Sequence, residues 1–324
     1  MAPVISEHKK PRLFHVHDVD SLSDTYQVTQ LGYMQTTPGK LDARIYRVTT
    51  PSVEASDASY KAGVLLTAEQ RYPRFGLGIG LSGEAQLMGT NLTNSNVGYL
   101  NGHNGVIARL ERNTRWCNVT VDWNLIQQVA ITHRYKIPQG DDSHAIPSKL
   151  HNKLAHFLSL IARGKAMGEL NDAQFEDEVA FTVLRALNPP LNPRRKIQAS
   201  ARRTVALQVI DYIHAHYRDR TTITGLCNIA GVSERSLQYI FRDATGLSVQ
   251  GYLMNFRLHQ ARKLLGKGLV SSVKEASEAC GIPHAGRFSM YFKEMFDEYP
   301  ADILARSGGR SLPAVVDRHE VILH

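Results

Sequence analysis

The hydrophobic pattern of residues 13–125 is that of short β-strands. Apolar or alternating runs in this stretch cover residues 41–48, 75–81, 106–110 and 114–121. Glycine and asparagine turns separate the runs, and short strands between such turns are typical of a small barrel or sandwich. Glycines inside 75–81 indicate bends or a close backbone approach, as in a curved wall. This part is therefore predicted to be a β-barrel or sandwich.

Residues 147–187 change to a helical period. One apolar stripe consists of Leu150, Leu154, Phe157, Leu158 and Ile161. A second amphipathic helix is predicted over 172–187. The two helices could form a dimer interface or could pad the barrel, and these roles do not exclude each other. The dimerisation candidates are Leu150, Leu154, Phe157 and Ile161.

The clearest boundary in the chain is 188–196, Asn-Pro-Pro-Leu-Asn-Pro-Arg-Arg-Lys. Three prolines prevent a helix from continuing there. The pattern predicts a basic, proline-rich linker over 188–203. Its cations are Arg194, Arg195, Lys196, Arg202 and Arg203. They form either a flexible tether that also touches DNA phosphate or a solvated linker without contacts. Arg195 is the residue at which a phosphate contact would be tested.

Residues 204–305 show two helix-turn-helix patterns in tandem. A helix over 204–217 leads into the first pattern, whose second helix is predicted at 234–244. Thr222 and Ser233 suit the N-caps of its two helices. Gly231 suits the positive φ of the turn between them. Each pattern has the order of helices that places a recognition helix in the major groove of DNA.

A long helix over 249–265 is predicted to connect the two patterns and to fix their spacing. The second pattern begins near Ser272 and turns at 281–284. Aromatic side chains at helical spacing, including Phe288 and Phe292, are interpreted as the core side of its second helix. One chain could then contact two adjacent segments of the major groove, about one turn apart.

The outward positions of the two recognition helices differ in chemistry. The candidate DNA contacts are Ser233, Arg235, Gln238, Tyr239 and Arg242 in the first unit, and His284, Ala285, Gly286, Arg287, Met290 and Lys293 in the second. Arg and Gln side chains match the edges of guanine and adenine. The second unit offers strong polar contacts only at Arg287 and Lys293, so the first unit is expected to choose the sequence.

A resemblance to a known family rests on these stretches. They are Gly231–Phe241, Gly246–Leu253, Arg257–Leu265, Gly281–Phe292 and Tyr299-Pro300. Together they resemble the DNA-binding domain of the AraC/XylS family of bacterial transcription regulators. The resemblance implies binding to asymmetric half-sites near promoters, and base contacts at Arg235, Gln238 and Tyr239 and at Ala285, Gly286, Arg287 and Met290. Tyr239 and Met290 stand where arginine is frequent in that family.

The N-terminal half is similar, more loosely, to the effector-binding and dimerisation domain of ligand-responsive members. The resemblance implies an α+β chain, with a cupin-like β-barrel and helical segment over 13–187, a linker, an all-α DNA-binding domain over 204–305, and a tail from 306. An organic acid, aromatic or otherwise, is the expected effector. It would need arginine and an aromatic lid. The candidate pocket residues are Arg44, Tyr46, Arg47 and Trp116.

Charge and cysteine content agree with this interpretation. Of the formal net charge of +8, residues 191–324 carry +7, from 19 Lys and Arg against 12 Asp and Glu, and residues 1–190 carry +1, from 19 against 18. A basic segment beside a neutral one indicates a polyanionic partner. Three cysteines argue against a secreted disulfide scaffold. The start has no secretory apolar region and no run is long enough to span a membrane, so a cytoplasmic, nucleoid-associated bacterial protein without membrane contact is expected.

Enzymatic motifs are absent from the sequence. His15, His17, His103 and His133 lack the spacing of a metal site, and there is no phosphate loop or nucleophile elbow. We therefore expect no metal, no cofactor and no enzyme. The expected protein is a homodimeric activator that binds promoter DNA, a small effector and RNA polymerase. The alternatives are a ligand-independent regulator controlled by a protein partner or by abundance, and a cupin-type enzyme with a DNA-targeting domain.

Overall fold

The computed structural model describes residues 11–25, 31–68, 74–101, 105–137, 144–164, 171–187 and 196–307. Of the residues named above, His103, Arg194 and Arg195 lie outside these ranges. So do the first half of the predicted linker, residues 188–195, and residues 308–324 of the tail. The order of elements is two antiparallel β-sheets with four helices among and after their strands, followed by a wholly helical part. The predicted mixed fold is confirmed at this level.

The larger sheet has seven antiparallel strands. In spatial order they are β1 (Arg12–Val16), β3 (Ala43–Thr49), β4 (Val53–Tyr60), β11 (Thr114–Asp122), β6 (Arg74–Ser82), β9 (Asn96–Asn101) and β12 (His144–Pro147). The second sheet has five strands, β2 (Leu31–Gln35), β5 (Val64–Ala68), β10 (Val106–Leu110), β7 (Ala85–Leu87) and β8 (Thr90–Leu92). The short helix α1 (Val19–Asp24) lies between β1 and β2. Four of these strands coincide closely with the runs predicted from sequence.

The two sheets share an apolar core between them. Ile45, Ala58 and Trp116, from adjacent strands of the seven-stranded sheet, belong to the same buried cluster as residues of the five-stranded sheet. The indole of Trp116 lies over Gly78, where a Cβ atom would come within 2.0 Å of it. A glycine is needed at this position because the ring occupies the space that a side chain would fill. This is the close approach that the glycines of 75–81 indicate.

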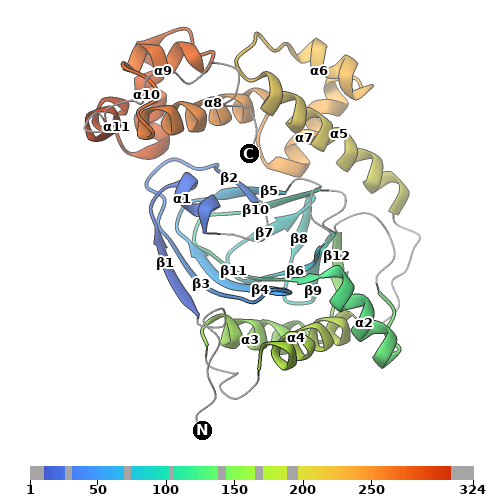
Figure 1. Cartoon of the computed structure of the whole chain (residues 1–324). Helices are drawn as coiled ribbons and strands as arrows, with labels where there is room; N and C mark the ends of the chain where they lie inside the picture. Colours follow the sequence, from blue (N-terminus) through green and yellow to red (C-terminus); the bar gives the residue numbers. More distant parts are fainter. Residues whose placement is uncertain are drawn as a thin grey trace.

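Three helices cover the other face of the seven-stranded sheet. They are α2 (Trp123–His133), α3 (His151–Ala162) and α4 (Asp172–Leu187), seen below the strands in Figure 1. The sequence predicts α3 and α4 closely. Residues 123–125 were expected to close the β domain but begin α2, whose N-cap Asp122 accepts from the Asn124 amide at 2.8 Å. That cap starts a helix directly after the last long strand.

A buried ion cluster fixes α3 to the sheet. Asp57 on β4 accepts hydrogen bonds from Arg115 at 2.6 Å, and from Ser159 and Arg163 at 2.7 Å each. Burial raises the pKa of Asp57, but these hydrogen bonds outweigh it and hold the pKa below its usual value. Asp57 is therefore ionised at neutral pH. Arg163 also lies 4.3 Å from the centroid of the Tyr46 ring.

The C-terminal part consists of seven helices within the described range 196–307. They are α5 (Lys196–His216), α6 (Ile223–Ala230), α7 (Glu234–Thr245), α8 (Val249–Gly266), α9 (Val273–Ala279), α10 (Ala285–Phe296) and α11 (Pro300–Ser307). One difference from the sequence prediction is the start of α5. It begins at Lys196 rather than 204, so the second half of the predicted linker, with Arg202 and Arg203, is helical. The prolines that stop a helix all precede this point.

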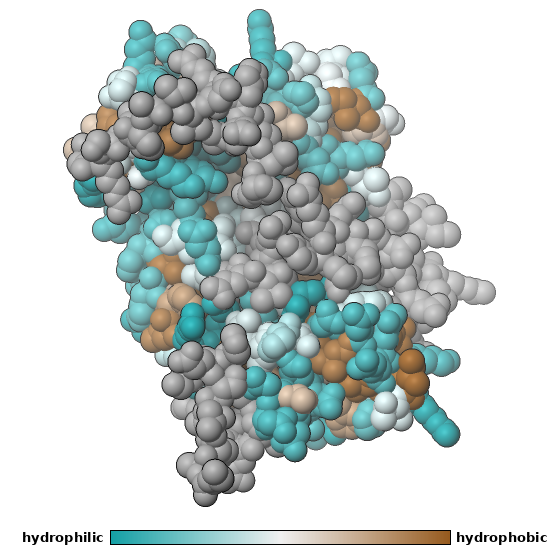
Figure 2. All heavy atoms as spheres, viewed as in Figure 1, coloured by the Kyte–Doolittle hydropathy of each residue, from teal (hydrophilic) through white to brown (hydrophobic). Residues whose placement is uncertain are grey.

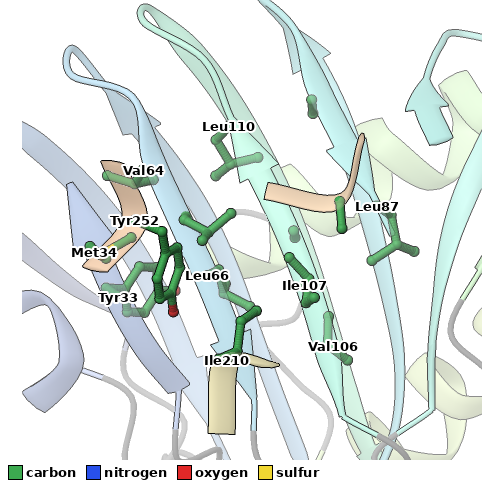
Figure 3. Close-up of a cluster of buried hydrophobic side chains, with 14 of the residues drawn as sticks. Tyr33, Met34, Val64, Leu66, Leu87, Val106, Ile107, Leu110, Ile210 and Tyr252 are labelled. Atoms are coloured by element: carbon green, nitrogen blue, oxygen red, sulfur yellow. The ribbon is translucent and has the colours of Figure 1, made fainter. Parts of the chain in front are cut away.

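The helical part lies on the five-stranded sheet (Figure 1). Ile210 of α5 and Tyr252 of α8 are buried in the same cluster as Tyr33, Leu66 and Ile107 of that sheet (Figure 3). An apolar contact of this kind excludes water from both surfaces. The β-sheets and the helices α5–α8 therefore share one continuous core, which the sequence alone does not reveal.

Candidate nucleic-acid interface

The turn between α6 and α7 forms as the sequence predicts. Thr222 caps α6 by accepting from the Gly225 amide at 3.1 Å, and Ser233 caps α7 by accepting from the Ser236 amide at 3.3 Å. Gly231 ends α6 with φ of 64°, in the left-handed region. These local contacts determine how α7 leaves the turn and so which face it exposes.

One side of α7 is buried and the opposite side is open. Leu237 and Phe241 are fully buried against the core. Arg235, Tyr239 and Arg242 are exposed, as is Ser233 at the cap, whereas Gln238 is half-buried. The candidate contacts of the first unit therefore share a surface, as their helical spacing predicts.

The second pair, α9 and α10, has a similar plan. Ser272 caps α9 by accepting from the Glu275 amide at 3.1 Å. Phe288 and Phe292 of α10 are fully buried. Of the remaining candidates on this unit, His284, Gly286, Arg287 and Met290 are exposed, and Ala285 is half-buried. The outward surface of α10 therefore presents fewer polar groups than that of α7.

Lys293, the other predicted polar contact of α10, is occupied within its own helix. Its Nζ donates to the Asp297 carbonyl oxygen at 2.8 Å and lies 3.0 Å from the Asp297 carboxylate. It also lies 5.2 Å from the centroid of the Tyr299 ring. A cation at a helix C-terminus is favourable there. A DNA contact by Lys293 would have to compete with these partners.

Arg257 on α8 holds the loop between α5 and α6. Its Nε donates to the Tyr217 carbonyl oxygen at 2.6 Å, and Nη2 donates to the Asp219 carbonyl oxygen at 2.8 Å. The turn that enters α10 packs on the same loop, since a Cβ on Gly281 would lie 2.7 Å from the Arg218 carbonyl oxygen. Arg257 thereby helps to set the distance between the two helix pairs, a role that the sequence analysis did not assign.

Two half-buried histidines contribute to the contacts of α5 and α8. Burial lowers the pKa of His214 to about 4, and its Nε2 lies 2.8 Å from the Tyr252 hydroxyl. Burial also lowers the pKa of His259 to about 4, and its Nε2 donates to the Gln35 carbonyl oxygen at 3.2 Å. Both rings are therefore neutral at pH 7. His259 connects α8 to strand β2.

Strand β2 and the segment after it also contact the C-terminal end of α10. The Met295 carbonyl oxygen accepts from Gln35 Nε2 at 2.9 Å and from the Gly39 amide at 3.1 Å. These two donors satisfy a carbonyl group that has no partner further along its own helix. Arg262 on α8 also lies 3.7 Å from Asp18, beside α1.

The C-terminal end of α7 is held against the same sheet. Arg109 of β10 packs on Gly246, the C-cap residue, where a Cβ would come within 1.9 Å of Nη1. Gly246 has φ of 76°, which also favours glycine. The positive guanidinium at a helix C-terminus is electrostatically favourable. The sheet therefore contacts α7 and α10, both at their C-terminal ends.

Residues 226–306, which include these helix pairs, match the family model described as "Helix-turn-helix domain". The chain is 28% identical over 155 residues to the HTH-type transcriptional activator RhaS of Escherichia coli O1:K1, which covers 47% of this chain and 55% of the relative. These matches support the assignment of the helical part to the AraC/XylS family of transcription regulators.

Other similarities of this chain are shorter. It is 33% identical over 97 residues, 29% of each chain, to the probable thc operon regulatory protein of Rhodococcus erythropolis. A solved structure of a probable AraC family transcriptional regulator from Rhodopseudomonas palustris is 30% identical, with 32% of this chain and 97% of that chain covered and a TM-score of 0.31. The chain spans about half the length of the RhaS relatives it matches.

The candidate effector residues divide between two faces of the seven-stranded sheet. Arg47 and Trp116 are buried on the inner face, which packs toward the second sheet. Arg44 is exposed, and Tyr46 lies under Arg163 on the helix-covered face. Strand alternation explains the division, because residues 44 and 46 share a face that residue 47 cannot share. The structure therefore does not bring the four together.

Polar residues of the inner face were missed by the sequence analysis. Ser56 donates to Asn118 across neighbouring strands, and both are buried. Thr120 accepts from Arg74 Nε at 3.3 Å. These residues lie on the same face of the sheet as Arg47 and Trp116. Ser56 pairs with Arg47 on the neighbouring strand, and Trp116, Asn118 and Thr120 follow one another at intervals of two residues along β11. Alternation along each strand shows which residues share a face of that strand. To group residues of different strands, the pairing and register of the strands must also be known.

Among the described residues, which include His15, His17 and His133, no group of three or more His, Cys, Asp or Glu side chains could hold a metal ion. Within the same ranges, no helix is long and apolar enough to cross a membrane.

Proposed function

We propose that the chain binds duplex promoter DNA in a sequence-specific manner through two helix-turn-helix units, α6–α7 and α9–α10. The bound protein activates transcription in the bacterial cytoplasm, with RNA polymerase as its partner. The observation that carries this proposal is the open face of α7, where Arg235 and Arg242 are exposed and Gln238 is half-buried opposite a fully buried Leu237 and Phe241. Such side chains match base edges in the major groove. The second unit, with Arg287 as its exposed cation, is proposed to anchor the protein or read DNA shape.

Selection from a random pool of duplexes tests this proposal. The full chain is incubated with the pool, bound duplexes are recovered over several rounds, and the products are sequenced. A shared asymmetric motif with two half-sites about one helical turn apart is the expected result. Pools that show no enrichment, with or without added small molecules, would overturn the proposal.

The two sheets are proposed to form a cupin-like barrel that binds a small effector. Arg47 is 3% exposed on the inner face, and its guanidinium lies 4.8 Å from the centroid of the Phe14 ring. Arg47 and the buried Ser56–Asn118 pair favour an organic acid as the effector, because arginine pairs with carboxylates. A thermal-shift screen of organic acids against the full chain tests this class. No shift with any acid would favour the alternative, a regulator controlled by a protein partner or by its abundance.

The contacts between the five-stranded sheet and the helical part provide a route for coupling. The sheet touches α7 through Arg109 and α10 through Gln35. An effector that shifts this sheet would therefore change the positions of both recognition helices. Coupling requires that the effector binds the two arrangements with different affinity.

A second copy of the chain is the proposed occupant of the groove between α3 and α4. Leu150 and Phe157 line it with Lys153, Glu178 and Arg185, so two copies related by a twofold axis could pair acid with base. Figure 2 shows apolar surface in the neighbouring region, over α2 and α4. Leu154 and Ile161 are buried in the chain's own core and leave no surface for a partner. Sedimentation of Phe157→Glu against the unaltered chain tests the proposal, and an unchanged dimer would contradict it.

A further inference from the structure

The open face of α7 contains one large aromatic side chain among its polar ones. The Tyr239 side chain is 60% exposed and follows Arg235 by one helical turn. Part of this ring is contacted by a residue of another helix.

Arg202 of α5 lies against this ring. Its Cζ is 5.6 Å from the centroid of Tyr239, within the range of a cation–π contact. Arg202 is itself exposed. Within the described ranges no carboxylate forms an ion pair with it, so its charge is not neutralised there.

The position of Arg202 follows from the packing of α5. Ala206, Val209 and Ile213 are buried on the side of α5 that packs into the core shared with α7. Arg202 precedes Ala206 by one turn and so continues this stripe toward the N-terminus, where the stripe reaches the surface. The guanidinium therefore lies at the edge of the α5–α7 contact, beside the open face of the recognition helix.

A cation–π contact does not occupy the N–H groups of a guanidinium in hydrogen bonds, so they stay available as donors. Those donors match the oxygens of a phosphate in a bidentate manner. In helix-turn-helix complexes the sugar-phosphate backbone passes beside the recognition helix, whereas the base edges lie beneath it. Phosphate is accordingly the nearest DNA group to a cation at the edge of α7.

We propose that Arg202 contacts a phosphate of the bound duplex and that the ring of Tyr239 holds it at the DNA-facing edge of α7. Tyr239 is then a positioning residue and not a reader of base sequence. The inference rests on the proposed binding of DNA by α7. It assigns a fixed role to one cation of the segment that the sequence predicts to be a linker.

The test measures affinity against salt for two duplexes, the one selected by the unaltered chain and one of mixed sequence. Arg202→Ala is expected to weaken binding to both by the same factor, about threefold to tenfold, and to make the salt slope shallower by about 1. Tyr239→Phe retains the ring and should bind as the unaltered chain does. Tyr239→Ala releases the guanidinium and should weaken binding to both duplexes.

Two further variants separate this role from a structural one. Tyr239→Arg in the Arg202→Ala background places a cation at the same edge, and should restore the salt slope. Lys136→Ala removes one exposed positive charge three residues after α2, a helix on the side of the sheets away from the helical part (Figure 1), and should leave both affinities unchanged. Thermal unfolding shows that each variant is folded.

An Arg202→Ala variant with unchanged affinity and slope overturns the proposal. A loss confined to the selected duplex overturns the phosphate assignment, because it indicates a base contact. A Tyr239→Phe loss equal to that of Tyr239→Ala overturns the positioning role of the ring. If the unaltered chain binds no duplex, the proposed function fails as well. If Arg235→Ala weakens selective binding while Arg202→Ala has no effect, only this inference fails.

Discussion

At the scale of single residues, position on α7 separates two kinds of DNA contact. Arg235 and Gln238 lie on the face proposed to meet base edges, so Arg235→Ala or Gln238→Ala should cost about 1–3 kcal/mol on the selected duplex and little on a mixed-sequence one. Fluorescence anisotropy with both duplexes measures the difference. Equal losses on the two would mean that these side chains touch only the backbone.

A control for this prediction is available on the second unit. Met290 is exposed on α10 but cannot donate a hydrogen bond, so Met290→Ala should change sequence preference less than Arg235→Ala does. A larger effect of Met290→Ala would instead identify α10 as the helix that selects the sequence.

At the scale of elements, a few contacts hold the C-terminal ends of α7 and α10 on the five-stranded sheet. Gln35→Ala removes one of the two donors to the buried Met295 carbonyl oxygen and leaves the Gly39 amide, at a cost of about 1 kcal/mol. Amide hydrogen exchange in the last turn of α10 should then be about fivefold faster or more, if that turn opens separately from the rest of the protein.

Gln86→Ala is the matched control, since Gln86 in the same sheet donates to Asn91 within a hairpin and makes no contact with α10. It should leave exchange in α10 unchanged. Identical exchange in both variants and the unaltered chain would show that Gln35 does not hold this helix end.

At the scale of the whole molecule, two half-buried histidines make stability depend on pH. His214 and His259 have a pKa of about 4 when folded, below the ordinary 6.5, so protonation favours the unfolded chain. Their full contribution is present above about pH 6.5 and is lost as the pH falls toward 4. The midpoint of thermal unfolding, followed by circular dichroism, should therefore decrease as the pH is lowered from 6.5 to 4.

His259→Gln retains a donor for the Gln35 carbonyl oxygen but removes a titrating group, so its midpoint should fall less steeply between pH 6.5 and 4. A pH dependence that is the same in both proteins would rule out His259 as a cause.

Short-range features of the sequence determine the caps, the turns and the periodicity of several helices without any tertiary contact. The N-caps at Thr222, Ser233 and Ser272 and the left-handed Gly231 involve atoms only a few residues apart, so sequence suffices to predict them. The periodicity of α3, α4, α7 and α8 and the resemblance of residues 204–305 to the AraC/XylS family follow from the same short-range order.

Tertiary structure decided which of these elements meet. The division of Arg44 and Tyr46 from Arg47, the buried Ser56–Asn118 pair and the seating of α7 and α10 on the five-stranded sheet join segments far apart in the chain. So does the contact of Arg202 with Tyr239, across 37 residues. Periodicity shows that a residue lies on a face, but only the packing of the elements determines what that face contacts.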